Sequence, residues 1–227
     1  MTPAPVCGVV FDLDGTLVDS REDIVRSTNH ALAVSGYPTL PAGEIASYVG
    51  DGARLLLARS SRLLAGDPRL DALETTFLEY YTAHAVDHTR LIAGVEEVLD
   101  ALAPLPLALL TNKPRRATLA TLAALGLDRR LREIVAGDDL AERKPAPGGL
   151  LTIARRLALE PRALVMVGDA AQDVECGRAA GARTVGVEGG IQARERLAAA
   201  RPDALIPLRE LPALIRTWDP SALERPA

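Results

Sequence analysis

Apolar residues are distributed along this chain in two alternating patterns. In the first, short apolar runs end abruptly in polar residues, which is typical of strands buried in a parallel sheet. The clearest run covers residues 6–11 and is followed by Asp12-Leu13-Asp14-Gly15-Thr16. Similar runs occur further along the chain, at residues 107–110, 134–135, 163–167, 184–187 and 204–206. We expect each run to form one strand.

In the second pattern, apolar residues recur three or four positions apart, as they do on one face of a helix. Segments of this kind separate the expected strands, at residues 94–103, 114–126, 147–159, 171–180 and 211–217. Strands that alternate with helices predict a parallel sheet with right-handed crossovers. The fold class that we expect is therefore α/β, with a doubly wound parallel-sheet core of the Rossmann-like type.

The segment after the first strand has no strand pattern of useful length as far as residue 90. Its apolar spacing favours helices instead, at residues 20–36, 44–49, 53–64 and 67–86. Ser20 and Asp23 have the spacing of a capping box at the start of the first of these helices. The segment is therefore expected to be entirely helical.

These patterns predict two domains. Residues 1–18 and 90–227 would form an α/β core, and residues 19–89 an all-helical cap domain that is inserted after the first strand. Ligands of open α/β sheets bind at the carboxyl ends of the strands. The insertion point places the cap over those ends, where it could act as a lid.

Composition and charge narrow the range of partners. Of the 227 residues, 48% are apolar and 25% are charged, as in ordinary globular proteins. The formal net charge of −4 offers no basic surface to nucleic acid. The N-terminus does not resemble a signal peptide, and the longest other apolar stretch, residues 101–110, is too short to span a bilayer. We expect a cytoplasmic protein without a nucleic-acid or membrane partner, and either a monomer or a homodimer.

The cysteines add no chemistry to this interpretation. Cys7 and Cys176 have neither a metal-ligand spacing nor the Cys-x-x-Cys spacing of redox proteins. Both lie in apolar or helical contexts, so we expect two free thiols, as in a reducing cytosol.

Two carboxylates follow the first strand at once. Asp12 and Asp14 would repel each other unless a cation lay between them. Mg²⁺ prefers oxygen ligands and often bridges carboxylates to a substrate phosphate. Gly15 permits a tight turn, and the Thr16 hydroxyl could bind an anion. An ordinary polar Asp-Gly turn explains the same residues equally well, so the spacing alone leaves both interpretations open.

Further polar clusters follow the other expected strands, namely Thr111/Asn112, Asp138/Asp139 and Gly168-Asp169 with Asp173. In a doubly wound sheet, such strand ends face one crevice. Lys144 follows the second of these clusters and is flanked by prolines. Carboxylates, a hydroxyl and a lysine in one crevice suit Mg²⁺ and a phosphoryl group, because phosphoryl transfer mainly needs charge neutralisation and positioning.

The clusters resemble the motifs of the haloacid-dehalogenase-like phosphohydrolases in order and approximate spacing. The residues that carry this resemblance are Asp12-Leu13-Asp14-Gly15-Thr16, Thr111-Asn112, Lys144-Pro145 and Gly168-Asp169-Ala170-Ala171-Gln172-Asp173. The helical insert between the first two motifs resembles the branch that contains phosphoglycolate phosphatases. The resemblance covers nearly the whole chain.

The resemblance implies a role for each motif residue. Asp12 would be the nucleophile that forms an aspartyl-phosphate intermediate. Asp14 would protonate the leaving oxygen and then deprotonate the attacking water. Thr111, together with Asn112, would bind the phosphoryl oxygens. Lys144 would hold the Asp12 carboxylate and the phosphoryl group by its charge.

The resemblance also implies the cofactor, Mg²⁺. Its ligands would be the Asp12 side chain, the Asp14 backbone carbonyl and Asp169, and Asp173 would support the metal site. An ordinary charge at a helix N-terminus is the alternative for Asp173.

The chain departs from the family pattern at two positions. Ala170 stands where relatives commonly carry Ser or Thr, and Gln172 where Asn is frequent. Neither change removes a charge from the predicted site, so we expect the reaction class to be retained, whereas the lost hydroxyl could weaken the metal site and lower the rate.

Specificity is expected to come from the helical insert. Its segment Gly50-Asp51-Gly52-Ala53-Arg54 resembles the loop that phosphoglycolate-phosphatase-like caps turn toward the active site. Arg54 could pair with a substrate carboxylate through its guanidinium, or it could lie on an exposed helix face.

The other polar residues are expected to lie mostly outside the site. We predict a surface position at a helix start for Lys113 and packing or surface roles for His30, His84 and His88. For Asp138 and Asp139, solvation in a loop and a role in the site remain open.

The predicted function is a Mg²⁺-dependent phosphatase that acts on a small phosphorylated metabolite, with 2-phosphoglycolate as one candidate. A sugar-phosphate mutase of the β-phosphoglucomutase kind shares these core residues. A non-catalytic phosphate-binding regulatory protein is the alternative from a different class. Turnover of a phosphomonoester and analysis of the products separate the three.

Overall fold

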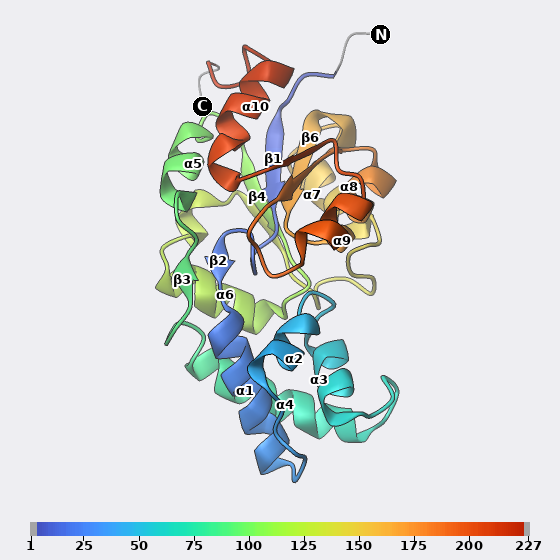
Figure 1. Ribbon diagram of the computed structural model, residues 1–227. Helices are drawn as coiled ribbons and strands as arrows, with labels where there is room; N and C mark the ends of the chain where they lie inside the picture. The colour runs from blue at the N-terminus through green and yellow to red at the C-terminus, as the bar shows by residue number, and fades with distance from the viewer. Residues whose placement is uncertain (1–3, 225–227) are drawn as a thin grey trace.

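A computed structural model describes residues 4–224 of the chain. Its centre is a six-stranded parallel sheet with the order β5-β4-β1-β6-β7-β8 (Figure 1). The strands are β1 (Gly8–Phe11), β4 (Leu107–Leu110), β5 (Glu133–Val135), β6 (Leu164–Gly168), β7 (Arg183–Val187) and β8 (Ala204–Ile206). The α/β fold class is thus confirmed, and every apolar run named above overlaps one of these strands to within one residue at the carboxyl or amino end or contains it entirely.

Strand β1 lies in the middle of the sheet because its residues are apolar on both faces. Val9 and Phe11 belong to one hydrophobic cluster, whereas Val10 belongs to the cluster on the opposite face. This alternation is the two-residue period of a strand. Strands β4 and β5 lie on one side of β1, and strands β6, β7 and β8 lie on the other side. A ligand-binding crevice is expected where the strand order reverses, next to β1.

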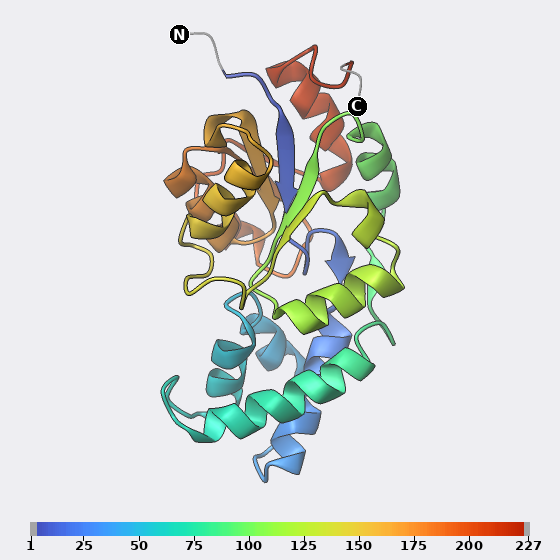
Figure 2. The same ribbon diagram turned by 180° about the vertical axis from the view of Figure 1, so that it is seen from behind.

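Helices cover both faces of the sheet (Figures 1 and 2). They are α5 (Val95–Ala101), α6 (Arg115–Ala124), α7 (Gly148–Arg156), α8 (Ala171–Ala180), α9 (Arg194–Ala199) and α10 (Leu211–Trp218), with short 3-10 turns η1 (Asp128–Arg130), η2 (Pro161–Ala163) and η3 (Leu208–Glu210). Helices α5 and α10 pack on the cluster that contains Phe11. Helices α7 and α8 contribute to the cluster that contains Val10. Helix α9 is an addition to the predicted elements, because its six residues are too few for a clear apolar period.

The segment between β1 and β4 contains α1 (Arg21–Val34), α2 (Ala42–Ser47), α3 (Ala53–Ser61) and α4 (Arg69–Ala83). We call these four helices and their loops the insert. The insert has a hydrophobic core of its own, in which Leu32, Leu57 and Leu70 are fully buried. Figures 1 and 2 show it at one end of the sheet, where α4 lies against α6. Ala117 of α6 is buried in the same cluster as the insert, so the two parts share apolar contacts.

Two short strands connect the insert to the sheet domain, which the sequence did not predict. Strand β2 (Val18–Asp19) pairs antiparallel with β3 (Arg90–Leu91). The buried carboxylate of Asp23 accepts hydrogen bonds from the backbone N–H groups of His88, at 3.0 Å, and Thr89, at 2.7 Å. These contacts join residues distant in sequence, and two-residue strands show no period. Sequence patterns therefore could not reveal them.

Cys7 and Cys176 are not joined by a disulfide, as expected. Burial raises the pKa of the Cys176 thiol to about 11, so this residue packs as an inert apolar group. Within residues 4–224, no helix has the length and the apolar character that crossing a membrane requires.

Candidate active site

A crevice opens at the carboxyl ends of β1, β4 and β6, between the sheet and the insert. The sheet domain lines it with charged and polar side chains, including Asp12, Asp14, Thr111, Asn112, Lys144, Asp169, Gln172 and Asp173. The insert lines it mainly with apolar side chains, including Ile24, Val49, Leu56 and Phe77. One wall can therefore carry ionic chemistry, and the other excludes water from it.

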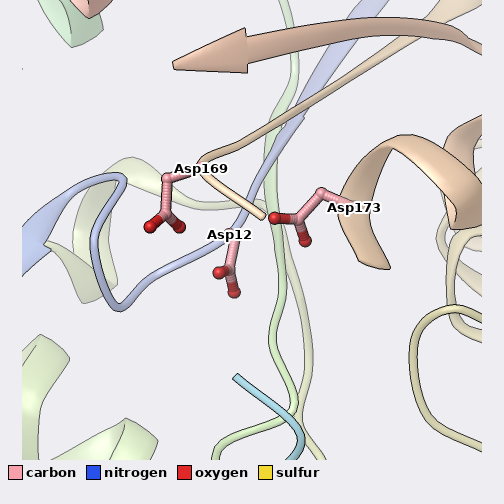
Figure 3. Close-up of side chains that lie close together, drawn as sticks. All are labelled: Asp12, Asp169 and Asp173. Carbon is pink, nitrogen blue, oxygen red and sulfur yellow. The ribbon is translucent and has the colours of Figure 1, made fainter. Parts of the chain in front are cut away.

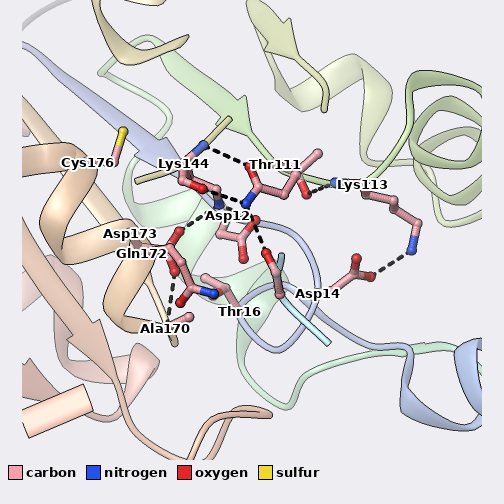
Figure 4. Close-up of polar contacts among 12 residues, drawn as sticks. Asp12, Asp14, Thr16, Thr111, Lys113, Lys144, Ala170, Gln172, Asp173 and Cys176 are labelled. Atoms are coloured by element: carbon pink, nitrogen blue, oxygen red, sulfur yellow. Dashed lines mark hydrogen bonds and ion pairs between the residues drawn. The ribbon is translucent and has the colours of Figure 1, made fainter. Parts of the chain in front are cut away.

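Asp12 and Lys144 form the centre of the polar wall (Figure 4). The Nζ atom of Lys144 lies 2.7 Å from Asp12 Oδ1 and 2.6 Å from Asp173 Oδ1. Burial disfavours the charged ammonium, but the two carboxylates outweigh burial and raise the pKa of Lys144. Lys144 is therefore a permanently charged group beside the predicted nucleophile.

Three buried carboxylates converge beside this lysine. One oxygen each of Asp12, Asp169 and Asp173 lies within 4.8 Å of the others, and Figure 3 shows the three groups facing one space. Burial, reinforced by the charge of Asp12, raises the pKa of Asp169 to about 6. Burial raises the pKa of Asp173 to about 7 despite the adjacent Lys144. Three carboxylates against one ammonium leave an excess of negative charge, so the donor set fits a divalent cation with oxygen ligands.

Asp169 is held in place from two sides. Its Oδ2 accepts hydrogen bonds from the backbone N–H groups of Ile191, at 2.6 Å, and Gln192, at 3.3 Å, and its Oδ1 accepts one from the Thr16 hydroxyl at 3.3 Å. A Cβ atom on Gly15 would lie 2.3 Å from Asp169 Oδ2, so only glycine fits there. The structure directs the fully buried Thr16 toward Asp169 and not into the crevice, where the sequence had placed it as a substrate ligand.

Thr111 lines the crevice at the end of β4, whereas the side chain of Asn112 is directed at backbone groups. Asn112 Nδ2 donates to the carbonyl oxygens of Gly50, at 2.9 Å, and Lys144, at 3.0 Å. Asn112 Oδ1 accepts from the backbone N–H of Lys144 at 2.9 Å. Asn112 thereby positions Lys144 and ties the insert loop to the sheet domain, and a direct contact with the substrate stays a prediction.

Asp173 also has a supporting geometry. Its Oδ1 binds Lys144, and its Oδ2 accepts a hydrogen bond from the backbone N–H of Ala170 at 3.0 Å. A Cβ atom on Gly168 would lie 2.1 Å from Asp173 Oδ2, so the turn after β6 closes tightly around this carboxylate. Asp173 therefore fixes both the lysine and the turn that carries Asp169.

Asp14 stands apart from the three clustered carboxylates. Its Oδ1 accepts hydrogen bonds from Ser20 Oγ, at 2.6 Å, and from Lys113 Nζ, at 2.8 Å. Ser20 therefore does not form the capping box with Asp23 that its spacing had suggested, and α1 has no side-chain cap. The separation leaves Asp14 available for a role different from that of Asp12.

The expected surface position of Lys113 is wrong, because its side chain is only 4% exposed. Besides Asp14, its Nζ binds the hydroxyl of Tyr81 on α4 and lies 4.4 Å from the centre of the Tyr81 ring. The only signal in the sequence was that Lys113 and Lys144 are the two lysines of an arginine-rich chain. Tyr81 gave no signal at all.

Arg54 does not reach the crevice. Its guanidinium pairs within the insert with Asp71, at 2.7 Å, and Glu74, at 3.3 Å. The glycine-bracketed loop before it does line the crevice, through Gly50 and Gly52. The loop therefore lies where it was predicted, but Arg54 does not. Helix α3 begins after Gly52 and directs the Arg54 side chain toward α4.

We expect the substitution Arg54→Ala to leave catalysis nearly unchanged. The guanidinium pairs with the exposed Asp71 and the partly exposed Glu74, away from the crevice, so KM and kcat should each stay within about twofold of the unmodified protein. Steady-state kinetics of phosphate release measure both constants. A large rise in KM alone would show that Arg54 leaves its ion pairs to bind the substrate.

Gln172 is a further contact between the two walls that the sequence did not predict. Its Nε2 donates to Asp51 Oδ1 of the insert at 2.8 Å. Its Oε1 is buried and has no hydrogen-bond partner among residues 4–224. A buried amide oxygen without a partner is costly, so it offers an acceptor to a ligand that enters the crevice.

The remaining polar candidates lie elsewhere. Asp138 accepts a hydrogen bond from the backbone N–H of Arg115 at 2.7 Å, and Asp139 pairs with the Arg115 guanidinium at 2.5 Å. Neither acid borders the crevice, and neither does any of the described histidines.

Comparisons with known proteins point to one family. The sequence model for haloacid dehalogenase-like hydrolases matches residues 9–187. A plasmid-encoded phosphoglycolate phosphatase of Cupriavidus necator is 39% identical over 93% of this chain and 94% of its own length. The phosphoglycolate phosphatase of Chromobacterium violaceum is 38% identical over 79% of this chain and 83% of its own. The crystal structure of a predicted phosphoglycolate phosphatase from Haemophilus somnus superposes with a TM-score of 0.85 at 28% identity, covering 94% of this chain and 99% of that one.

Proposed function

Because this chain belongs to the haloacid dehalogenase-like hydrolases and is a phosphoric monoester hydrolase, we propose that it dephosphorylates a small metabolite through an aspartyl-phosphate on Asp12. The observation that carries the mechanism is the position of Asp12. Its carboxylate lies at the end of the central strand, 2.7 Å from the Lys144 ammonium and beside two further carboxylates. A nucleophile in this position is stabilised by the ammonium on one side, and on the other side the two carboxylates could share a cation with it.

In the first step, the Asp12 carboxylate attacks the phosphorus atom, and the bond from phosphorus to the leaving oxygen breaks. Lys144 stabilises the negative charge of the phosphoryl oxygens, and the Thr111 hydroxyl donates a hydrogen bond to one of them. Asp14 gives a proton to the leaving oxygen. The organic product departs as an alcohol.

In the second step, Asp14 removes a proton from a water molecule, and the water oxygen attacks the phosphorus of the aspartyl-phosphate. The bond between phosphorus and Asp12 breaks, which releases inorganic phosphate and restores the carboxylate. Each step uses one proton at Asp14, so the enzyme returns to its starting state.

The cofactor of the proposal is Mg²⁺, which would neutralise phosphoryl charge and orient the phosphoryl group in line. Asp12, Asp169 and the Asp14 backbone carbonyl would hold it, with Asp173 in a supporting role. The excess negative charge of the three buried carboxylates supports this assignment. Burial and the charge of Asp12 raise the pKa of Asp169, and a bound cation would oppose both by favouring the charged carboxylate.

The substrate proposed first is 2-phosphoglycolate, the substrate in the names of the relatives from Cupriavidus and Chromobacterium. The insert would act as a cap, because its apolar residues Val49, Leu56 and Phe77 face the reacting groups. A screen of phosphate release over phosphoglycolate, sugar phosphates, nucleotides and pyrophosphate tests this proposal. Conversion of β-glucose 1-phosphate into an isomeric sugar phosphate would instead favour a mutase. If no phosphate ester is turned over, the result would favour a non-catalytic binding protein.

Removal of the metal is the second test. We expect EDTA to abolish phosphate release, because the phosphoryl group would then meet an uncompensated cluster of carboxylates. Excess Mg²⁺ should restore the rate. The measurement compares initial rates with EDTA, with EDTA plus excess Mg²⁺, and without either. Equal rates in EDTA would contradict the assignment of a metal to this site.

A further inference from the structure

One charged contact of the crevice has no part in the mechanism above. It joins Asp14 to Lys113 of the sheet domain and, through Lys113, to Tyr81 of the insert. Both donors that reach Asp14, Ser20 Oγ and Lys113 Nζ, bind the same oxygen, Oδ1. Within residues 4–224, no other residue donates a hydrogen bond to Asp14 Oδ2.

This arrangement decides which oxygen of Asp14 handles a proton. An oxygen that accepts two short hydrogen bonds is a poor place for a proton in either state of the carboxyl group. Oδ2 has no such bond, and the side chain as a whole is 14% exposed to the crevice. Anchoring through Oδ1 therefore leaves Oδ2 to exchange a proton with the substrate.

Lys113 in turn is held by the insert. Tyr81 is 1% exposed and lies in the hydrophobic core of the insert, on α4. Its hydroxyl accepts a hydrogen bond from Lys113 Nζ, and its ring lies 4.4 Å from the same atom. The ammonium thus joins a carboxylate of the sheet domain to an aromatic side chain of the insert.

We propose that Lys113 is the positioning residue for Asp14, and that Tyr81 makes this positioning depend on the seating of the insert. The proposal rests on the function proposed above. Asp14 passes the proton on Oδ2 to the leaving oxygen as its bond to phosphorus breaks, and later takes one from the attacking water. Lys113 keeps its three protons throughout and reacts with nothing. It holds the carboxyl group in one orientation during both transfers.

The test uses the dependence of the rate on the leaving group. An alkoxide, as from phosphoglycolate, leaves slowly without a proton, whereas p-nitrophenolate leaves readily without one. Because the second step is the same for every substrate, the rate compared is that of the first step, measured as release of the organic product in a single turnover with excess enzyme. In Lys113→Met, this rate should fall by about 10²-fold to 10⁴-fold for phosphoglycolate and by less than about tenfold for p-nitrophenyl phosphate. Tyr81→Phe should change the ratio of the two rates in the same direction by a smaller factor, because Lys113 keeps its contact with Asp14.

Tyr80→Phe is the matched control. Tyr80 precedes Tyr81 on α4, but its ring stacks between His30 and His84, with centroid distances of 3.9 Å and 4.2 Å, away from the crevice. Both rates should equal those of the unmodified protein. Circular dichroism of each variant checks its folding. If Lys113→Met does not fold, the ratio of the rates of Tyr81→Phe with the two substrates tests the proposal instead.

The possible outcomes separate the two proposals. If the unmodified protein releases phosphate and the first-step rates of the variants fall equally for both substrates, Lys113 has only a general structural role and the positioning proposal is overturned. An unchanged rate ratio in both variants overturns it as well. If the unmodified protein hydrolyses no phosphomonoester, the proposed function fails, and the role of Lys113 fails with it.

Discussion

Asp12→Asn is expected to abolish phosphate release. The amide has the shape of the carboxylate but neither its charge nor its nucleophilic oxygen, so no aspartyl-phosphate can form. The expected loss in kcat exceeds about 10³-fold, the scale seen when a catalytic nucleophile is removed. Assays with phosphoglycolate and with p-nitrophenyl phosphate should agree, because every leaving group needs the nucleophile.

Asp138→Asn provides the control for this substitution. Asp138 also follows a strand of the sheet, yet it lies outside the crevice, where its Oδ1 accepts a hydrogen bond from the backbone N–H of Arg115. An asparagine oxygen can accept the same bond, so activity and stability should be preserved. Appreciable turnover by Asp12→Asn, free of contaminating phosphatase, would contradict an intermediate on this residue.

Lys144→Met is expected to affect both activity and folding. The side chain of Lys144 is 3% exposed and is the partner of Asp12, at 2.7 Å, and of Asp173, at 2.6 Å. Methionine fills a similar volume but leaves two buried carboxylates without their ammonium. Loss of one partner from a buried ion pair lowers the free energy of unfolding by about 3–5 kcal/mol. Phosphate release should also fall severely, because the phosphoryl charge loses a stabilising group.

Urea unfolding in the absence of divalent cations measures the effect on stability. Arg156→Met is the matched control, since Arg156 is 48% exposed and pairs with Glu133 at 3.3 Å. Its substitution should change the free energy of unfolding by less than about 1 kcal/mol. An unfolding midpoint for Lys144→Met equal to that of the unmodified protein would mean that Asp12 and Asp173 do not depend on this lysine. Added Mg²⁺ should lessen the loss of stability, because it supplies positive charge to the same carboxylates.

The sequence by itself determined the framework of this protein. Residues 6–11 are apolar at every position, and a strand apolar on both faces must lie inside a sheet. Val10 then faces one cluster and Phe11 the other. Because parallel strands end at one edge, the polar residues after β1, β4 and β6 had to meet there. The order of the strands therefore predicted that Asp12 and Asp169 would lie in one crevice, and the structure brings their carboxylates together with that of Asp173.

Only the tertiary structure decided which polar side chains face the crevice. Arg54 lies within two residues of the crevice loop but pairs with Asp71, whereas Lys113 lies beneath Tyr81 against Asp14. Each outcome depends on a partner from a different element, brought close by the packing of α4 on α3 and α6. A charged side chain goes to the position where its desolvation is best compensated. The compensating partners are remote in sequence, so local sequence patterns cannot predict where such a side chain lies.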